Sequence, residues 1–188
     1  MRTNATRYVI LGMLSEEPMA GYDIKKLVDL RFRFFWSESF GQIYPELKKL
    51  AKEGLVEALP DAAEAGGRQK KTYGITEAGK EVFGTWMNRK PEGEKQRFEF
   101  LLKIFWAPWL PMRRIDEYVG DFMDRHGRDL EMLRKMEREL LAVAGKHPNH
   151  RWVLQTIRLG LRVNEAYLAW GSDFLAEMEG WDDEAGQN

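Results

Sequence analysis

The stretch SFGQIYPELKKLAKEG, Ser39 to Gly54, has the pattern of a short amphipathic helix. Its apolar positions recur at helical intervals and predict one core-facing side, made by Ile43, Leu47, Leu50 and Ala51. Ser39 and Gln42 fit a capping box, and Gly54 suits the left-handed position that follows a last turn. The other side carries stacking, hydrogen-bonding and cationic groups, namely Phe40, Gln42, Tyr44, Lys48, Lys49 and Lys52. Such a face is typical of a helix that enters a DNA groove, although a solvated surface helix has similar charges. In the DNA-binding interpretation Ser39 is one of the contact residues, and the amide of Gln42 is expected to read adenine.

Pro45 conflicts with a regular helix that is capped at Ser39. Proline has no amide hydrogen and is comfortable only in a first turn, whereas this cap places Pro45 sixth. The sequence leaves two alternatives: the regular helix begins nearer Gly41, or its first turn is irregular.

The composition predicts a folded protein of the reducing cytoplasm. The 188 residues are 44% hydrophobic and 12% aromatic, which is sufficient for a buried core. There are no cysteines, so disulfides and thiolate metal sites are excluded. No apolar run approaches about 18 residues, so no membrane span is expected. Residues 1–90 contain 15 Lys and Arg against 12 Asp and Glu, and residues 91–188 contain 14 against 18, so the N-terminal half is the more basic.

The N-terminal half reads as three helices, a hairpin and a fourth helix. Helices are predicted over residues 7–14 and 21–35, before the helix of residues 39–54, and over residues 77–88 after Thr76, a good N-cap. Residues 55–60 and 68–75 resemble two strands joined by a Gly-Gly loop. The aromatic cluster Phe32, Phe34, Phe35 and Trp36 is interpreted as core filling, and the fourth helix is expected to bury Ala78, Val82, Phe83 and Trp86.

This order of elements predicts a winged helix-turn-helix in residues 1–90. In that fold the third helix lies in the major groove and the hairpin, or wing, follows the phosphates. The wing here carries only cations near its tip, Arg68, Lys70 and Lys71, which have no evident core role. Some winged helices instead dock proteins, and that alternative remains open. Wing cations of one sign favour DNA, because a protein-docking wing has no need of them.

Several motifs of residues 7–90 resemble the PadR family of bacterial transcriptional regulators. They are YVILGMLS at 8–15, GYDI at 21–24, GQIYPELKKL at 41–50, EGLV at 53–56, Tyr73, and TEAG at 76–79. The resemblance implies a winged-helix homodimer, most often a repressor that a small molecule or stress signal releases. It also implies that Tyr44 and the basic residues of the third helix face DNA, with Arg68 and Lys70 serving the wing. The long C-terminal part resembles the virulence-activator branch, whose helical domain dimerises, so a transcriptional activator is the alternative.

Residues 91–188 are predicted to form an all-α dimerisation domain. After the Pro-Glu-Gly-Glu boundary at 91–94, a short helix reaches Trp106, with Phe98, Leu101, Leu102 and Phe105 at helical spacing. A long helix covers residues 112–144, and a last one covers 151–178. The tail, residues 181–188, is acidic and expected to be loose. The fold class is therefore mainly α with a small β-hairpin.

The last helix is predicted to have two apolar faces. One contains Ile157, Leu161, Leu168 and Leu175, and the other contains Val153, Gly160, Val163, Tyr167, Trp170 and Phe174. Because a three-helix domain covers only one such face well, the second predicts a C2 homodimer through the C-terminal helices.

Sites for catalysis or metal binding are not expected. The chain has three histidines and no phosphate-binding loop or Ser/His/Asp grouping, and Pro148 between His147 and His150 argues against a helical metal pair. We therefore predict no enzyme, cofactor or metal. Trp106 and Trp109 near the domain boundary suggest stacking on a flat aromatic effector, with core packing as the alternative.

Overall fold

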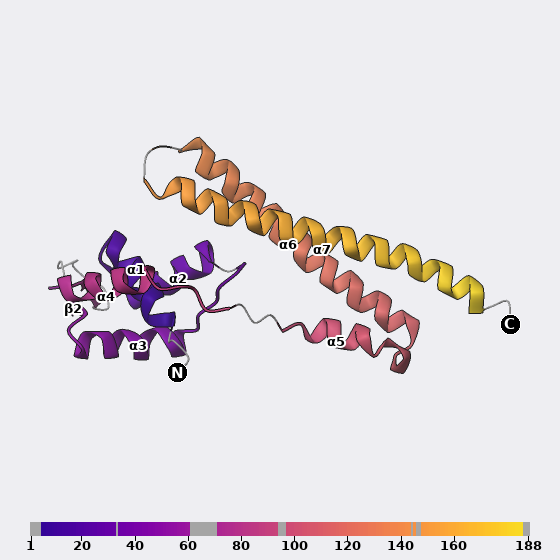
Figure 1. Ribbon diagram of the computed structural model, residues 1–188, viewed down its shortest axis with the longest axis horizontal. Coiled ribbons are helices and arrows are strands. Elements are labelled where there is room, and N and C mark those ends of the chain that lie inside the picture. The colour runs from indigo at the N-terminus through magenta and orange to yellow at the C-terminus, as the bar shows by residue number, and fades with distance from the viewer. Residues whose placement is uncertain are drawn as a thin grey trace, which may run out of the picture. The chain divides into compact units, whose positions relative to one another are not determined.

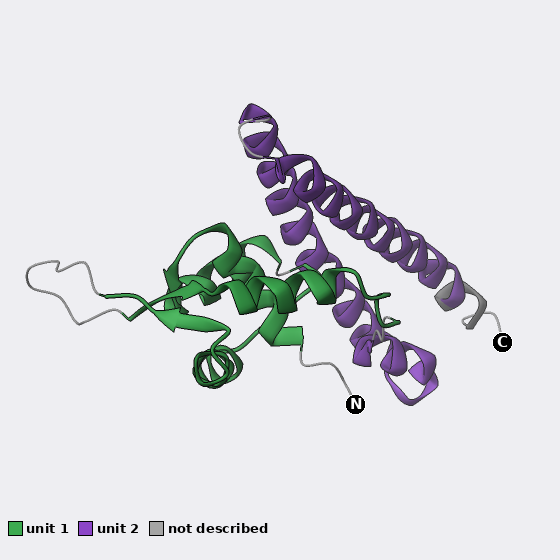
Figure 2. Cartoon of the chain, turned by 60° about the vertical axis from the view of Figure 1, so that its left-hand side comes forward, with its two compact units in different colours: residues 1–93 green, residues 94–188 purple. Residues whose placement is uncertain are grey.

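The computed structural model divides the chain into two compact units, residues 1–93 and 94–188 (Figures 1 and 2). It describes residues 5–32, 34–60, 71–93, 97–143, 145 and 148–185. Within these ranges no helix combines the length and the apolar character needed to cross a membrane. The sequence placed the division between residues 90 and 91, three residues before the division in the structure.

The first unit packs four helices against a small sheet. In chain order it contains α1 (Ala5–Glu16), β1 (Met19–Ala20), α2 (Gly21–Arg31), α3 (Phe40–Lys52), β2 (Val56–Ala58), β3 (Thr72–Ile75) and α4 (Glu77–Met87). The predicted apolar stripe of α3 faces the core, since Ile43, Leu47 and Leu50 are fully buried. They meet Ile10 and Leu11 of α1 in one continuous cluster, so α3 is held by its apolar side and its polar side stays outward.

The predicted start of α3 is confirmed. Ser39 is the N-cap, and the capping box with Gln42 is present. Pro45 lies inside the helix at its sixth position, so a start nearer Gly41 is wrong. Since proline has no N–H, it cannot donate the helical hydrogen bond to the carbonyl of Gly41.

The sheet has three antiparallel strands in the order β1-β3-β2, one more than the predicted hairpin. β2 and β3 pair in the register Val56 with Ile75, and the two-residue β1 pairs with the other edge of β3 through Met19 and Tyr73. β1 was missed because two residues are too few to show an alternating pattern. α4 then begins at the predicted cap, where Thr76 Oγ1 accepts from Gly79 N–H at 3.1 Å.

Two expectations about side-chain burial in this unit are wrong. α2 ends at Arg31, earlier than predicted, and the chain then turns so that Phe35 and Trp36 are exposed; only Phe32 packs against the core. In α4, Val82, Phe83 and Trp86 pack as predicted, but Ala78 is exposed. Its place is taken by Gly79, which is buried against the backbone of Leu55.

The second unit is a long helical hairpin with a short helix beside it. It contains α5 (Glu99–Phe105), the 3-10 turn η1 (Ala107–Trp109), α6 (Met112–Ala142) and α7 (His150–Ala185). α6 and α7 pack along much of their length, as Figure 1 shows. α7 includes residues 181–185, so the prediction of a loose tail is wrong for them, and residues 186–188 lie outside the described residues. Asn164 of α7 is buried, and its Oδ1 accepts from His126 Nδ1–H of α6 at 2.7 Å.

The apolar faces of this unit are arranged differently from the prediction. In α5, Phe100 and Ile104 pack inward, whereas the predicted face is exposed at Leu101, Leu102 and Phe105. In α7, Tyr167, Trp170 and Phe174 pack within the unit in an aromatic cluster with Phe98, Phe100 and Phe122. A second apolar face nevertheless exists, and its exposed members are Trp152, Leu159, Val163 and Trp181.

Candidate nucleic-acid interface

The outward side of α3 presents three lysines that lack carboxylate partners among the residues that the structure describes. Lys48, Lys49 and Lys52 are exposed, and none of them forms an ion pair within the described ranges. The acidic residues of α3 and its C-cap, Glu46 and Glu53, instead pair with Arg7 of α1, at 3.9 Å in the case of Glu46. The carboxylates are thus held on the α1 side, and the free face of α3 is cationic.

Gln42, a predicted base-reading residue, forms a capping hydrogen bond at the start of α3. Its Oε1 accepts the backbone N–H of Ser39 at 2.8 Å, which is one half of the capping box. A bidentate contact to adenine needs both amide atoms of the glutamine. The bond to Ser39 therefore competes with that contact, and it also assigns the predicted site residue Ser39 to the helix start.

Exposed aromatic rings surround the start of α3. The ring of Phe40 stacks between those of Tyr22 and Tyr44, with a centroid separation of 6.1 Å in each pair. The Lys25 ammonium lies 5.5 Å from the Phe40 ring centroid. Sequence reasoning identified Tyr44 and Phe40 as outward residues but missed Tyr22 and Lys25, because these belong to α2 and join α3 only through the fold.

The wing is described only in part. Lys71 is exposed at the start of β3, with its ammonium 5.5 Å from the ring centroid of Tyr73. Arg68 and Lys70, the other predicted wing cations, lie outside the described residues.

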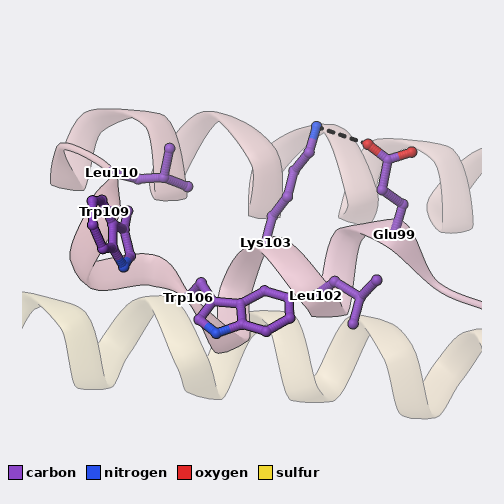
Figure 3. A pocket seen from close by; sticks show the side chains of 6 residues that line it. All are labelled: Glu99, Leu102, Lys103, Trp106, Trp109 and Leu110. Atoms are coloured by element: carbon purple, nitrogen blue, oxygen red, sulfur yellow. Dashed lines mark ion pairs between the residues drawn. The ribbon is translucent and has the colours of Figure 1, made fainter.

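Trp106 and Trp109 line the same shallow cavity in the second unit. Its volume is about 310 Å³, and its other lining residues are Glu99, Leu102, Lys103 and Leu110 (Figure 3). Trp109 is 87% exposed, and Trp106 is half exposed, so the alternative of core packing is wrong for both indoles. The polar pair in this cavity is Glu99 with Lys103, at 3.2 Å.

A second cavity of about 400 Å³ is more polar and shares Glu99 and Lys103 with the first. It is lined by four aromatic residues and by cationic, imidazole and acidic groups: Arg97, Phe98, Glu99, Phe100, Lys103, Tyr118, Asp121, Phe122, Arg125 and His126. The Lys103 ammonium lies 5.1 Å from the Tyr118 ring centroid. Flat rings beside guanidinium groups suit an aromatic carboxylate. Sequence reasoning missed this cavity because its residues come from α6 as well as from α5.

Comparison with known proteins assigns the chain to a family. Residues 10–85 match the transcriptional regulator PadR-like family, and residues 96–179 match the virulence activator alpha C-terminal domain. The negative transcriptional regulator PadR of Bacillus subtilis is 32% identical over 92% of this chain and 97% of its own length. The chain belongs to the PadR-like family. It is therefore a transcriptional regulator with a winged-helix fold, as the motifs predicted.

Solved structures of similar proteins agree with this assignment. Bacillus subtilis PadR in complex with operator DNA is 27% identical, with a TM-score of 0.82 over 94% of this chain and 99% of that chain. The structure of the same protein with p-coumaric acid is 28% identical in sequence, with a TM-score of 0.71 over 95% of this chain and 98% of that chain. The Vibrio cholerae virulence activator AphA is 25% identical in sequence, with a TM-score of 0.74 over 94% of this chain and 99% of that chain.

Proposed function

We propose that this PadR-family regulator is a homodimeric repressor that places α3 in the major groove and the wing along the phosphates. The observation that carries the proposal is the cationic face of α3, where Lys48, Lys49 and Lys52 are exposed without carboxylate partners in the described ranges. A polyanion supplies the missing counter-charges. The Bacillus subtilis relative, a negative regulator solved with operator DNA, supports repression, and the likeness to AphA keeps activation as the alternative.

Salt dependence tests the DNA proposal directly. Each protomer carries six candidate cations, the three lysines of α3 and the wing residues Arg68, Lys70 and Lys71. If half to two-thirds of them reach phosphates in the dimer, log affinity falls against log salt with a slope of about −5 to −7. The operator is first selected from a randomised duplex pool and then titrated at several salt concentrations. Salt-independent binding, or none, would favour the protein-docking alternative.

A matched pair of variants assigns this slope to α3. Lys48→Ala is expected to flatten it by about two units, because the loss counts twice in a dimer. Lys80→Ala removes the same charge from α4, where Lys80 pairs with Glu77, and is expected to leave the slope unchanged.

The centres of the two half-sites in the selected operator should lie about one helical turn, ~34 to 36 Å, or a multiple of it, apart.

Dimerisation is proposed from the exposed apolar side chains of the second unit. Leu159 is 67% exposed, and Trp152 and Val163 lie seven residues before and four residues after it on one side of α7. Contiguous exposed apolar surface of this kind marks protein interfaces. This face includes Val163 of the predicted second face, whereas Tyr167, Trp170 and Phe174 of that predicted face pack within the unit.

The effector is proposed to be a small aromatic acid that binds beside α5. Support comes from the exposed Trp106 and Trp109 in one cavity, the guanidinium groups of Arg97 and Arg125 in the other, and Lys103 between the two. The Bacillus subtilis relative was solved with p-coumaric acid, which is the probe of choice. It should quench tryptophan fluorescence and weaken operator binding.

Single substitutions locate that effector. Trp109→Phe should remove most of the quenching if the apolar cavity is used, whereas Arg125→Ala should weaken p-coumaric acid binding if the polar cavity is used. Binding unchanged in both variants would contradict an effector site beside α5.

A further inference from the structure

Three exposed rings form a continuous surface at the start of α3, and we refer to Tyr22, Phe40 and Tyr44 as the aromatic ladder. Phe40 is the middle ring, with interplanar angles of 15° to Tyr22 and 26° to Tyr44. Lys25 closes one side of it with its ammonium group. The ladder joins the first residues of α2 to the first turns of α3, which are the parts of a helix-turn-helix nearest to DNA.

The ladder does not contribute to the hydrophobic core. Phe40 is 46% exposed, and its two neighbours are exposed to a similar extent, although α3 already has its core contacts at Ile43, Leu47 and Leu50. The Tyr44 ring also lies close over Gly21, where an added Cβ would stand 2.9 Å from it. Phe40 is thus an apolar ring that is held in place by its neighbours and left open to a partner.

The surroundings of the ladder indicate what this partner offers. The lysines of α3, which have no ion-pair partner in the described part of the chain, favour a polyanion, but phosphate groups make no favourable apolar contact with a phenyl ring. In the major groove the apolar group on a base edge is the C5-methyl of thymine, which apolar side chains such as Phe contact. The amide oxygen of Gln42 is engaged with Ser39 N–H, so Gln42 cannot make a bidentate base contact while it caps α3, and apolar contact by Phe40 offers another readout at this end of the helix.

We propose that Phe40, held between Tyr22 and Tyr44, specifies thymine in each half-site by packing on its C5-methyl group. This inference rests on the proposed DNA-binding function and adds its base preference. Burying one methyl group contributes about 0.8 kcal/mol, which corresponds to about four-fold in affinity per half-site. Two symmetric half-sites then give about 15-fold.

The test replaces thymines of the selected operator by deoxyuracil, one symmetric pair at a time. Deoxyuracil lacks only the methyl group and keeps every hydrogen-bonding atom. One pair is expected to weaken binding of the full-length protein by about 15-fold. Phe40→Ala should bind the two operators equally, with the salt slope of the wild type. Lys48→Ala serves as the control and should keep the preference for thymine while its salt slope flattens.

The outcomes separate this inference from the function on which it rests. Normal salt-dependent operator binding with no deoxyuracil effect at any position would overturn the thymine contact and leave the DNA-binding function intact. A preference for thymine that persists in Phe40→Ala would overturn the assignment to Phe40. If no DNA is selected or bound, both the contact and the proposed function are wrong.

Discussion

At the scale of single residues, close backbone packing determines which substitutions the winged helix tolerates. Gly79 is buried in the first turn of α4, and a Cβ added there would overlap the carbonyl oxygen of Leu55. The Leu55 carbonyl cannot move away freely, because it accepts a hydrogen bond from Thr76 N–H. The neighbouring Gly54 carbonyl accepts another from Thr76 Oγ1. Position 79 therefore has no room for any side chain larger than that of glycine.

Gly79→Ala is expected to lower the free energy of unfolding by about 3 kcal/mol, the upper part of the usual range for overpacking. Gly84→Ala is the matched control on the same helix, because nothing lies within 4 Å of its added Cβ. That change should be neutral or stabilise by up to about 1 kcal/mol through helix propensity. Urea unfolding of both variants measures the contrast, and equal effects would contradict the packing argument.

Gln42 offers a second residue-scale prediction, since its amide oxygen caps α3. Gln42→Ala should cost about 1 kcal/mol of stability, as for other lost caps. Gln42→Glu keeps an acceptor at the same place and should remain near the wild-type stability. The measurement is the shift of the denaturation midpoint at constant m-value. If Gln42→Ala keeps full stability and only relaxes base preference, Gln42 is a base-reading residue rather than a cap.

At the scale of elements, a partly buried polar pair, His126 and Asn164, links α6 to α7. Asn164 Nδ2 donates to the carbonyl of Gly160, which leaves Oδ1 to accept from His126 Nδ1–H. The imidazole also packs between Phe122 and Tyr167, with ring centroids at 4.3 and 4.6 Å. Polar pairs inside an otherwise apolar helix interface favour one register over others, because any shift would leave both groups unsatisfied.

A double-mutant cycle of His126→Ala and Asn164→Ala should give a coupling energy of about 1 to 2 kcal/mol. The ion pair Arg134 with Glu165 joins the same two helices at 3.4 Å but is exposed, so its cycle should give less than about 0.5 kcal/mol. Both cycles are measured by denaturant unfolding at moderate salt. Equal coupling energies in the two cycles would show that partial burial does not strengthen the histidine–asparagine contact.

At the scale of the whole molecule, the second unit exposes more large apolar side chains than a monomer needs. They occur on α5, η1, α6 and α7, and include Leu102, Phe105, Trp109, Leu141, Trp152 and Leu159. Covering such a surface requires a second copy or another protein, and a symmetric dimer is the commonest arrangement of soluble oligomers.

Leu159→Asp combined with Val163→Asp is expected to shift the protein from dimer to monomer in sedimentation. Each change places a charge on the exposed apolar face of α7. Ser172→Asp adds a charge to an exposed position on the other side of the same helix and should leave the dimer intact. A fragment of residues 1–93 should likewise be monomeric. A fragment that dimerises as tightly as the full chain would place the interface in the first unit.

Local signals in the sequence determined where most elements begin and which side of α3 is buried. Ser39 with Gln42, Thr76, and the spacing of Ile43, Leu47 and Leu50 act within one or two helical turns, so the sequence around them is sufficient. The family motifs likewise sufficed to predict the winged helix.

Tertiary structure decided the features that join distant residues. β1 exists only because Met19 meets Tyr73, and the aromatic ladder exists only because Tyr22 of α2 lies beside Phe40 of α3. Periodicity also could not say which apolar positions of α5 and α7 are covered, because a hydrophobic pattern shows that a face is apolar and not which neighbour packs on it.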